Sequence, residues 1–575
     1  MNNAQIANVF DEIADLLEFQ GANPFRIRAY RNGARTINDL TEQLSTILEV
    51  RTRSLTDIDG IGKDLADKIT TLIHTGSLPQ LTELQAQVPH DVLAMMRIPG
   101  LGPKKAAALH KELNIQNLDQ LRAACEEQRV RQLKGFGAKT EETILKGLSL
   151  AASSDARIYW ADADKIAQAL LAHLKPTPGL HQIELAGSYR RRKETIGDLD
   201  ILVSAEDGEA VMDRLAAFDR VAEVIARGGT KMSVRLNTGP STFLQVDLRV
   251  VAEESFGAAL QYFTGSKEHN VVMRGMAKDL GLKINEYGVY RDDQSIAGKT
   301  EADVYATLGL PCFPPELREN RREFEWAAQG ALPQLVELSD IQGDLHMHTT
   351  ETDGTASLEE MVVAAQARGL KYIAITDHSK RVTMANGLDG PRLLAQWKQI
   401  DALNAKLTNF LVLKGVEVDI LEKGGLDIED EVLQHADWIV ASVHYGQKQP
   451  RDQITRRIVD ALANPYVCAI AHPTGRLINR RESYEVDLEA VYQTAKKHGK
   501  FLELNSSPMR LDLDDVHCAA AKQHGIPIVI STDAHSTDGL SALRYGIQQA
   551  RRAGLTPPDI VNTRPWPEIK KLLGR

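Results

Sequence analysis

The alternation of apolar and polar positions divides the chain into regions of different character. Up to about residue 150, apolar residues recur at helical spacing between polar turns, without a convincing strand pattern. From about 155 to 318 the pattern is mixed and predicts strands at 198–203, 233–236 and 243–251. A charged segment at 319–339 predicts a helix and a linker. Beyond it, short β-branched or aliphatic runs alternate with helical stretches, which predicts parallel strands joined by helices. We therefore expect a multidomain α+β and α/β protein.

Length and composition indicate the number of domains and the cellular compartment, but they do not identify the binding partner. A chain of 575 residues has material for about three or four globular domains. Four scattered cysteines without a CxxC motif argue against disulfides, and we find neither a leader pattern nor an apolar run of membrane-spanning length. We expect a cytoplasmic protein with no membrane contact. The net charge of −10 argues against a nucleic-acid partner, but it conceals local basic runs such as Arg190–Lys193.

In the last region nearly every apolar run is followed by a histidine or an acid. Carboxyl ends of parallel strands converge at one face of a barrel, so these side chains should lie together. Imidazoles and carboxylates together suit zinc, manganese or iron, and their number exceeds the needs of one ion. The region therefore predicts a multi-metal hydrolytic site. The runs with their polar ends are Gly343–His348, Ile373–His378, Gly415–Glu417, Ile439–His444, Ala469–His472 and Ile528–His535.

These motifs resemble those of the PHP (polymerase and histidinol phosphatase) family. The resemblance implies a distorted βα barrel that holds up to three ions, Mn²⁺ or Zn²⁺. The implied ligands are His346, His348, Asp353, His378, Glu417, His444, His472, Asp533 and His535. We expect further acids to orient the imidazoles, with a plain structural role as the alternative. These acids are Asp344, Asp377, Asp419 and Glu503.

A second cluster of acids lies in the mixed region. Asp198 and Asp200 alternate along a predicted strand and so face the same way, and Asp247 on a later strand can join them. Three carboxylates together repel one another unless divalent cations neutralise them, and a pair of Mg²⁺ ions in such a cluster catalyses phosphoryl transfer. Gly187–Ser188 ahead of these acids favours a site over a solvated loop.

These residues resemble the nucleotidyltransferase signature, and Tyr262–Ser266 is similar to the nucleotide-selecting segment of the X-family DNA polymerases, which include DNA polymerase beta. The resemblance implies a palm with a thumb, and it implies a role for each matching residue. Gly187, Ser188 and Arg191 would bind the triphosphate, Tyr262 and Phe263 the sugar beside Gly265, Asn270 the base and Arg274 the template. Core packing is the alternative for the two aromatic residues. Arg157 is a further candidate for the triphosphate, and Arg249 with Glu286 would switch between open and closed states.

Three turns in the helical region place glycine, an apolar residue and glycine directly before a helix. They are Asp59–Gly62, Pro99–Gly102 and Lys134–Gly137. A helix N-terminus behind such a turn offers free N–H groups to a phosphate, whereas the alternative is a tight interhelical turn. The turns resemble helix-hairpin-helix motifs, which grip the DNA backbone. The DNA-contacting residues we expect are Gly60, Gly62, Gly100 and Gly102.

Lys68 raises a further hypothesis. It matches the position of the Schiff-base lysine that removes a deoxyribose phosphate in eukaryotic X-family repair polymerases. Phe25 and Asp64 stand where those enzymes have basic pocket residues, so a simple phosphate contact or a solvated lysine is the alternative.

As a whole, the chain resembles bacterial X-family polymerases that carry a C-terminal PHP domain. The implied domains are a helical, lyase-like DNA-binding domain at 1–75, a helix-hairpin-helix subdomain at 76–150, palm and thumb at 151–318, a linker at 319–339 and the PHP barrel at 340–575. This resemblance implies templated filling of short gaps in DNA repair and a 3′–5′ exonuclease, in a monomer that binds gapped or nicked DNA and deoxynucleoside triphosphates. The rivals are an untemplated nucleotidyltransferase with a small-molecule phosphatase, and a catalytically silent scaffold that binds DNA ends.

Overall fold

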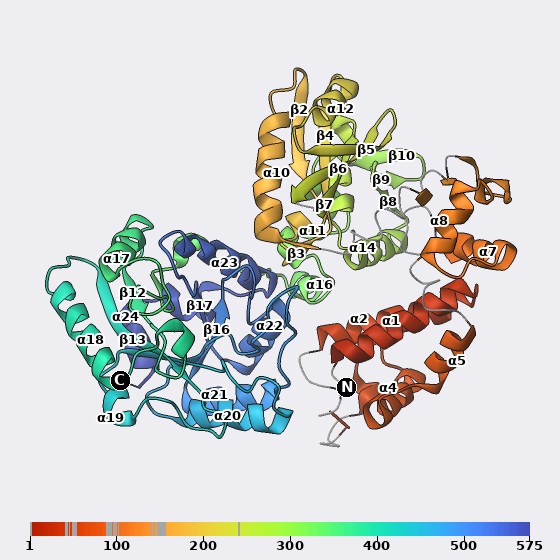
Figure 1. Ribbon diagram of the computed structural model, residues 1–575. Helices are drawn as coiled ribbons and strands as arrows, with labels where there is room; N and C mark the ends of the chain where they lie inside the picture. Colours follow the sequence, from red (N-terminus) through yellow and green to blue (C-terminus); the bar gives the residue numbers. More distant parts are fainter. Residues whose placement is uncertain are drawn as a thin grey trace. The chain divides into compact units, whose positions relative to one another are not determined.

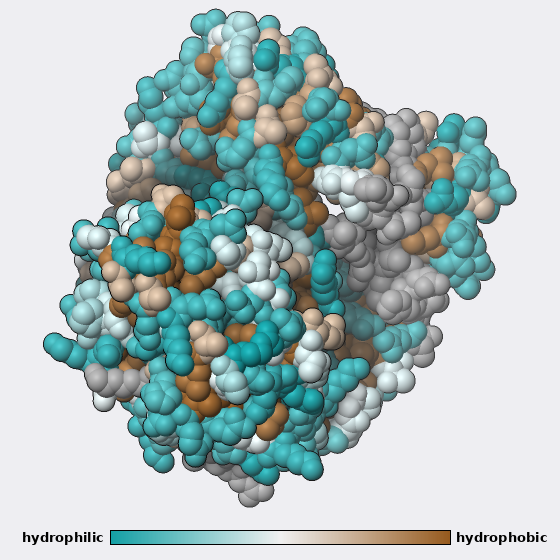
Figure 2. Space-filling view, turned by 60° about the vertical axis from the view of Figure 1, so that its left-hand side comes forward, coloured by the Kyte–Doolittle hydropathy of each residue, from teal (hydrophilic) through white to brown (hydrophobic). Residues whose placement is uncertain are grey.

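The computed structural model describes residues 3–40, 54–87, 103–138, 157–239 and 242–574, with single positions between these ranges at 44, 47, 48, 95, 101, 140, 141, 144 and 145 (Figure 1). The chain forms two compact units, Met1–Ala156 and Arg157–Arg575. None of the described helices is both long and apolar enough to span a membrane. The face of the molecule in Figure 2 is largely hydrophilic, with apolar side chains in scattered groups.

The first unit consists of helices around one apolar core. Helix α1 packs against α2, α5 and α7, and its Phe10 and Ile13 are buried in the centre. Asn23 begins α2 by accepting a hydrogen bond from the Phe25 N–H (2.9 Å). No strand occurs among the described residues of this unit, as predicted. The elements are α1 (Asn3–Phe19), α2 (Pro24–Asp39), η1 (Leu55–Asp57), α4 (Lys63–Thr75), α5 (Pro79–Gln87), α7 (Pro103–Leu113), α8 (Leu118–Glu126) and η2 (Val130–Gln132).

The second unit begins with a five-stranded sheet in the order β2-β4-β7-β6-β5. Strands β4 and β7 are parallel, and the other neighbours are antiparallel. Helices α10 and α12 pack together, and their apolar faces share one core with the sheet. The elements are β1 (Ile158–Tyr159), α10 (Trp160–Leu174), β2 (Leu180–Leu185), α11 (Gly187–Arg190), β3 (Thr195–Ile196), β4 (Asp198–Ala205), α12 (Gly208–Ala216), β5 (Val221–Arg227), β6 (Lys231–Gly239) and β7 (Thr242–Val250).

A smaller helical region with its own core follows this sheet. Ala258, Met273, Val304 and Phe313 are among its buried residues, and a three-stranded antiparallel sheet in the order β10-β9-β8 completes it. The elements are η3 (Glu253–Ser255), α13 (Phe256–Thr264), α14 (Lys267–Asp279), β8 (Lys283–Asn285), β9 (Gly288–Arg291), β10 (Gln294–Ala297), α15 (Glu301–Ala306), η4 (Pro315–Leu317) and α16 (Glu323–Ala328).

The last region is a parallel sheet of seven strands in sequence order, covered by helices (Figure 1). Strands β12, β14 and β17 are almost wholly apolar, as expected where both faces of a sheet are covered. Beyond the first and last strands, Met347 and Ala534 form a parallel bridge, so the sheet nearly closes into a barrel. The strands are β11 (Gly343–Asp344), β12 (Tyr372–Ile375), β13 (Leu411–Asp419), β14 (Trp438–Ser442), β15 (Ala469–Ile470), β16 (Phe501–Asn505) and β17 (Ile528–Ser531).

Eight α-helices of this region, among its described residues, connect or flank the strands. Helix α23 packs against β16 and β17. The helices are α17 (Leu358–Ala367), α18 (Gly390–Asn404), α19 (Asp430–Leu433), α20 (Arg451–Ala463), α21 (Leu488–His498), α22 (Asp515–His524), α23 (Leu543–Arg552) and α24 (Trp566–Leu572).

The predicted fold class is confirmed, but the sequence pattern did not predict every strand. The expected strands at 198–203, 233–236 and 243–251 correspond to β4, β6 and β7. Strands β2, β5 and β8–β10 were not predicted. They are short or largely exposed, so their sequences carry little apolar signal.

Candidate active sites

Three carboxylates meet on the two parallel strands of the five-stranded sheet. Asp198 begins β4, Asp200 follows on the same face, and Asp200 stands in register with Asp247 on β7. Burial, then the charges of Asp198 and Asp247, raise the pKa of Asp200 to about 7. Burial and Asp247 also raise the pKa of Asp198. An all-carboxylate cluster of this kind fits divalent cations such as Mg²⁺, which would relieve the repulsion.

Asp247 is the most firmly held of the three acids. Its carboxylate accepts hydrogen bonds from the Ser233 hydroxyl and from Nε2 of Gln245 (3.0 Å), and it lies 3.5 Å from Nζ of Lys231. The other two acids line a cavity of about 810 Å³, and Asp247 is not among its lining residues.

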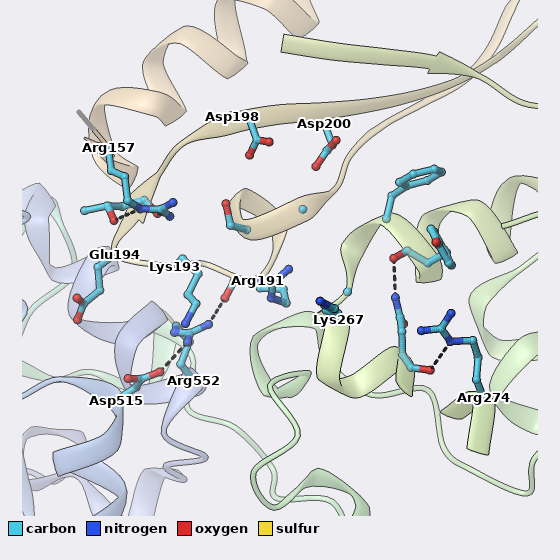
Figure 3. Close-up of a pocket in the computed structure, with 17 residues that line it drawn as sticks. Arg157, Arg191, Lys193, Glu194, Asp198, Asp200, Lys267, Arg274, Asp515 and Arg552 are labelled. Carbon is cyan, nitrogen blue, oxygen red and sulfur yellow. Dashed lines mark hydrogen bonds and ion pairs between the residues drawn. The ribbon is translucent and has the colours of Figure 1, made fainter. Parts of the chain in front are cut away.

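All of the nucleotide-contacting residues predicted from the sequence line this same cavity (Figure 3). Asp198 and Asp200 extend into it from β4. Arg157, Lys193 and Lys267 also line the cavity, as do Glu194 and Asp515, so cations outnumber acids on the wall away from β4. The predicted residues that line it are Gly187, Ser188, Arg191, Tyr262, Phe263, Gly265, Asn270 and Arg274.

Glycine at 187 lets the short helix α11 pass close to the acids. Its φ is +61°, in the left-handed region, and a Cβ there would collide with the carboxylate of Asp200. The next arginines hold α11 in place. Arg190 donates to both oxygens of Glu301 (2.8 and 2.7 Å), and Arg191 donates from Nε to Glu319 (3.1 Å) and from Nη1 to the Thr264 carbonyl.

Helices α13 and α14 fix the aromatic end of the cavity. Nδ2 of Asn270 donates to the carbonyl of Tyr262 (2.8 Å), whose ring meets that of Phe263 edge-on. The Arg249 guanidinium lies 4.3 Å from the centre of the Phe263 ring. Among the described residues Arg249 makes no ion pair with Glu286, so their switching role stays a prediction.

The barrel brings all nine predicted ligands together at the carboxyl ends of its strands. Three sets can each hold one ion, with ligand atoms within 4.8 Å of one another. The sets share His348 and His378, so they adjoin, and His472 lies beside Glu417 (Nε2 to Oε1, 3.1 Å). The sets are His348, Asp353, His378 and His535; His346, His348 and Asp533; and His378, Glu417 and His444.

Unpartnered nitrogens show that this cluster fits metal ions. Nε2 of His346 and Nδ1 of His348 are buried and have no hydrogen-bond partner among the described residues. Burial lowers the pKa of His378, but Glu417 and Asp353 together raise it to about 10. Burial likewise lowers the pKa of His444, but Glu417 and Asp419 together raise it to about 9. A bound cation would replace these protons.

The four acids predicted to orient imidazoles divide into two pairs. Oε1 of Glu503 lies 2.7 Å from Nδ1 of His346, and Oδ1 of Asp419 lies 3.2 Å from Nδ1 of His444. Asp344 and Asp377 instead accept hydrogen bonds from Thr532, Thr349, Thr352 and Gln396. The first pair can orient metal-binding imidazoles, whereas the second pair fixes the surrounding backbone.

Sequence reasoning missed Arg510 at the edge of the metal cluster. Its Nε lies 3.7 Å from Oδ2 of Asp533, and its Nη1 is buried without a hydrogen-bond partner among the described residues. Its position shortly after β16 is the sequence feature that could have indicated a role at the site. Arginine is not a metal ligand, however, so the pattern of metal-binding residues did not include it.

In the helical unit the first glycine turn precedes helix α4, as predicted. Gly60 has φ +84° and Gly62 caps α4, while Gly135 in the third turn has φ +87°. Gly100 and Gly102 lie outside the described residues. Their DNA contacts and those of Gly60 and Gly62 stay predictions.

Lys68 lies on α4 and is already engaged. Its amine pairs with Asp64 and lies 5.6 Å from the centre of the Tyr30 ring, while Phe25 is exposed at the start of α2.

Family models match the chain along most of its length. They are a helix-hairpin-helix domain (1–78), a SAM-like helix-hairpin-helix tandem (92–149), the DNA polymerase beta palm (157–246) and thumb (259–319), and the PHP domain (344–507).

Curated relatives agree with these models. A "Probable phosphatase" of Thermoanaerobacter sp. is 31% identical over 231 residues, covering 38% of this chain and 89% of its own. One of Acetivibrio thermocellus is 32% identical over 201 residues, covering 33% and 78%. The "DNA polymerase/3'-5' exonuclease PolX" of Bacillus subtilis is 40% identical over 577 residues and covers 100% of both chains. A match of that extent, with palm, thumb and PHP domain all present, means that the chain belongs to the PolX family, the X-family DNA polymerases with a PHP domain.

Proposed function

We propose that this chain is a DNA-templated polymerase that fills short gaps during DNA repair and trims 3′ ends in its PHP domain. The relative from Bacillus subtilis is named for both activities. The observation that carries the proposal is the presence of two separate clusters in one chain. One has acids beside a cation-rich cavity, and the other has imidazoles with unpartnered nitrogens.

In the palm, the chain's own residues bind and align the reactants. Ser188 and Arg191 hold the triphosphate, and Tyr262 and Phe263 border the sugar. Asn270 contacts the base and Arg274 contacts the template. The primer 3′ hydroxyl then forms a bond to the α-phosphorus as the bond to pyrophosphate breaks. Asp198, Asp200 and Asp247 would hold a pair of Mg²⁺ ions, which supply charge neutralisation for the attacking and leaving oxygens.

In the barrel, the nine ligands would hold up to three Mn²⁺ or Zn²⁺ ions, which supply Lewis acidity for phosphodiester hydrolysis. Glu503 and Asp419 orient His346 and His444 for this task. Arg510 would contact the scissile phosphate, because its Nε lies 3.7 Å from Oδ2 of Asp533 and its Nη1 has no hydrogen-bond partner among the described residues.

The rivals explain fewer of these residues. Phosphatase-like relatives fit a hydrolytic barrel, but Asn270 and Arg274 line the palm cavity where a templated pair would lie, and the helix-hairpin-helix matches fit a DNA partner. The domain boundaries, the preference for gapped or nicked DNA and the monomeric state stay part of this proposal.

The test is extension and shortening of a labelled primer on gapped DNA, with Mg²⁺ or Mn²⁺ and each deoxynucleoside triphosphate offered singly. We expect addition only of the nucleotide that pairs with the template, and shortening when triphosphates are withheld. Equal addition of all four, or addition without a template strand, would favour the untemplated rival.

A further inference from the structure

The cavity that we assign to the nucleotide has a wall built by the PHP domain. Arg552, the last residue of α23, and Asp515, the first residue of α22, line it opposite the acids of β4 (Figure 3). Both residues lie more than 300 positions beyond Asp198 and Asp200 in sequence. The polymerase site is therefore completed by the domain that carries the other activity.

Arg552 holds three groups at once from a buried position. Its Nη1 donates to the backbone carbonyl of Arg191 (2.6 Å) and to Oε1 of Glu319 (3.0 Å), and its Nη2 donates to Oδ2 of Asp515 (2.7 Å). The Arg552 side chain is only 1% exposed. Its planar fork suits this arrangement, because it can reach acceptors in several directions without rearranging.

Glu319 links Arg552 to the guanidinium of Arg191. The same Oε1 that accepts from Arg552 also accepts from Nε of Arg191 (3.1 Å). Burial alone would raise the pKa of Glu319, but Arg552 and the neighbouring cations lower it to about 2, so it stays ionised. Arg191 is thus held at its main chain by Arg552 and at its side chain by Glu319, which Arg552 holds in place.

We propose that Arg552 is a positioning residue of the polymerase site, which aims Arg191 at the phosphates of the incoming nucleotide. The inference rests on the proposed function, because it takes the ligand of the cavity to be a nucleoside triphosphate. Lys193 lines the same wall with its Nζ 3.8 Å from Glu319, so the wall keeps a surplus of cations that suits a polyphosphate.

Arg551, the preceding residue, provides a matched control. It also joins the PHP domain to the end of the thumb, through Glu316 (2.8 Å), and to the linker that follows, through the carbonyl of Val336 (3.2 Å), but it does not line the cavity. A variant at Arg551 therefore loosens the same junction without touching Arg191.

The experiment is steady-state incorporation of dTTP opposite adenine in gapped DNA by the full-length protein, with inorganic pyrophosphate as a competing ligand. We expect Arg552→Ala to raise the KM for dTTP and the inhibition constant of pyrophosphate roughly tenfold, because a hydrogen bond to a charged group has about that weight in binding. The kcat and the exonuclease rate should stay within about twofold, as should every parameter of Arg551→Ala.

Two further variants keep the test decisive if Arg552→Ala fails to fold. Arg552→Lys keeps the charge but not the fork, so its KM should rise about threefold or more. In a Glu319→Gln background, either Arg552 variant should raise the KM for dTTP by less than it does alone, because both residues act on Arg191.

An unchanged KM in the folded Arg552 variants, or an equal rise in Arg551→Ala, would overturn the positioning role. Absence of incorporation by the unmodified protein would instead contradict the proposed function.

Discussion

The palm cluster and the PHP cluster both gather charged side chains at strand ends, but the charges of the two clusters are compensated in opposite ways. In the palm, three acids face one another, and burial and their repulsion raise the pKa of Asp200 to about 7. In the barrel, acids alternate with imidazoles, so the pKa of Glu417 is well below its usual value despite burial and that of His378 reaches about 10. The palm thus needs added cations to hold its charges, whereas the barrel already balances its own with protons.

The comparison predicts that the palm acids matter for one activity only. Replacing Asp247 by Asn removes a charge that stands in register with Asp200, so nucleotide addition should fall on the order of a thousandfold. Shortening of single-stranded 3′ ends should persist. The measurement is single-turnover addition, with Glu223→Gln as a control because Glu223 pairs with Arg235 on the same sheet. Loss of both activities in a folded Asp247→Asn protein would contradict separate sites.

The converse change is made in the barrel. Asp533→Asn weakens a ligand beside His346 and His348, so we expect bound metal and exonuclease activity to fall roughly a hundredfold, with addition retained. Metal content by mass spectrometry and the hydrolysis rate are the measurements, and Asp401→Asn on the exposed face of α18 is the control. Full hydrolysis with depleted metal would place the nuclease elsewhere.

The opposite balance of charges also predicts how each site responds to pH. His378 and His444 hold protons at neutral pH in the metal-free state, and a metal must displace them. Lowering the pH from about 8 to about 7 should therefore weaken metal binding by the barrel roughly tenfold for each proton released. Calorimetry in buffers of different ionisation enthalpy counts those protons, and an Asp533→Asn background isolates the palm. Metal binding by the barrel without proton release would refute this contrast.

A smaller effect is expected at the aromatic end of the palm cavity. Tyr262→Ala should raise ribonucleotide incorporation relative to deoxyribonucleotide several-fold, up to about tenfold, because less bulk then crowds the ribose 2′ hydroxyl. The ratio of kcat/KM values is measured in an Asp533→Asn background, so that trimming does not mask misincorporation. An unchanged ratio would assign Tyr262 to packing against Phe263.

The last of these predictions concerns Lys68. Lys68→Ala should abolish any borohydride trapping on DNA that carries a deoxyribose phosphate, whereas Asp64→Asn should increase it, because the ion pair with Asp64 must break before the amine can attack. Absence of trapping by the unmodified protein would end this hypothesis.

The barrel was the more predictable of the two clusters, for a physical reason. Its histidine ligands follow buried strands within a few residues, so an apolar run with a nearby histidine predicts them, whereas Glu417 lies within β13 and Asp353 lies in the loop after β11. The palm needed more than local pattern, since the register that sets Asp247 beside Asp200 depends on pairing between strands far apart in sequence.

Long-range polar contacts left no sequence signal at all. Arg552 and Glu319 are separated by 233 positions, and nothing near either residue indicates that both hold Arg191. Arg510 could not be predicted for a different reason, because an arginine after a strand is common on protein surfaces.

The most direct test of two independent sites is one primer on gapped DNA, followed in time with Asp198→Ala, His346→Ala and the protein that carries both changes. The account predicts that Asp198→Ala only shortens the primer, that His346→Ala only extends it, and that the double variant does neither. If His346→Ala still shortens the primer, or if Asp198→Ala stops both reactions in a folded protein, the two-site account is contradicted.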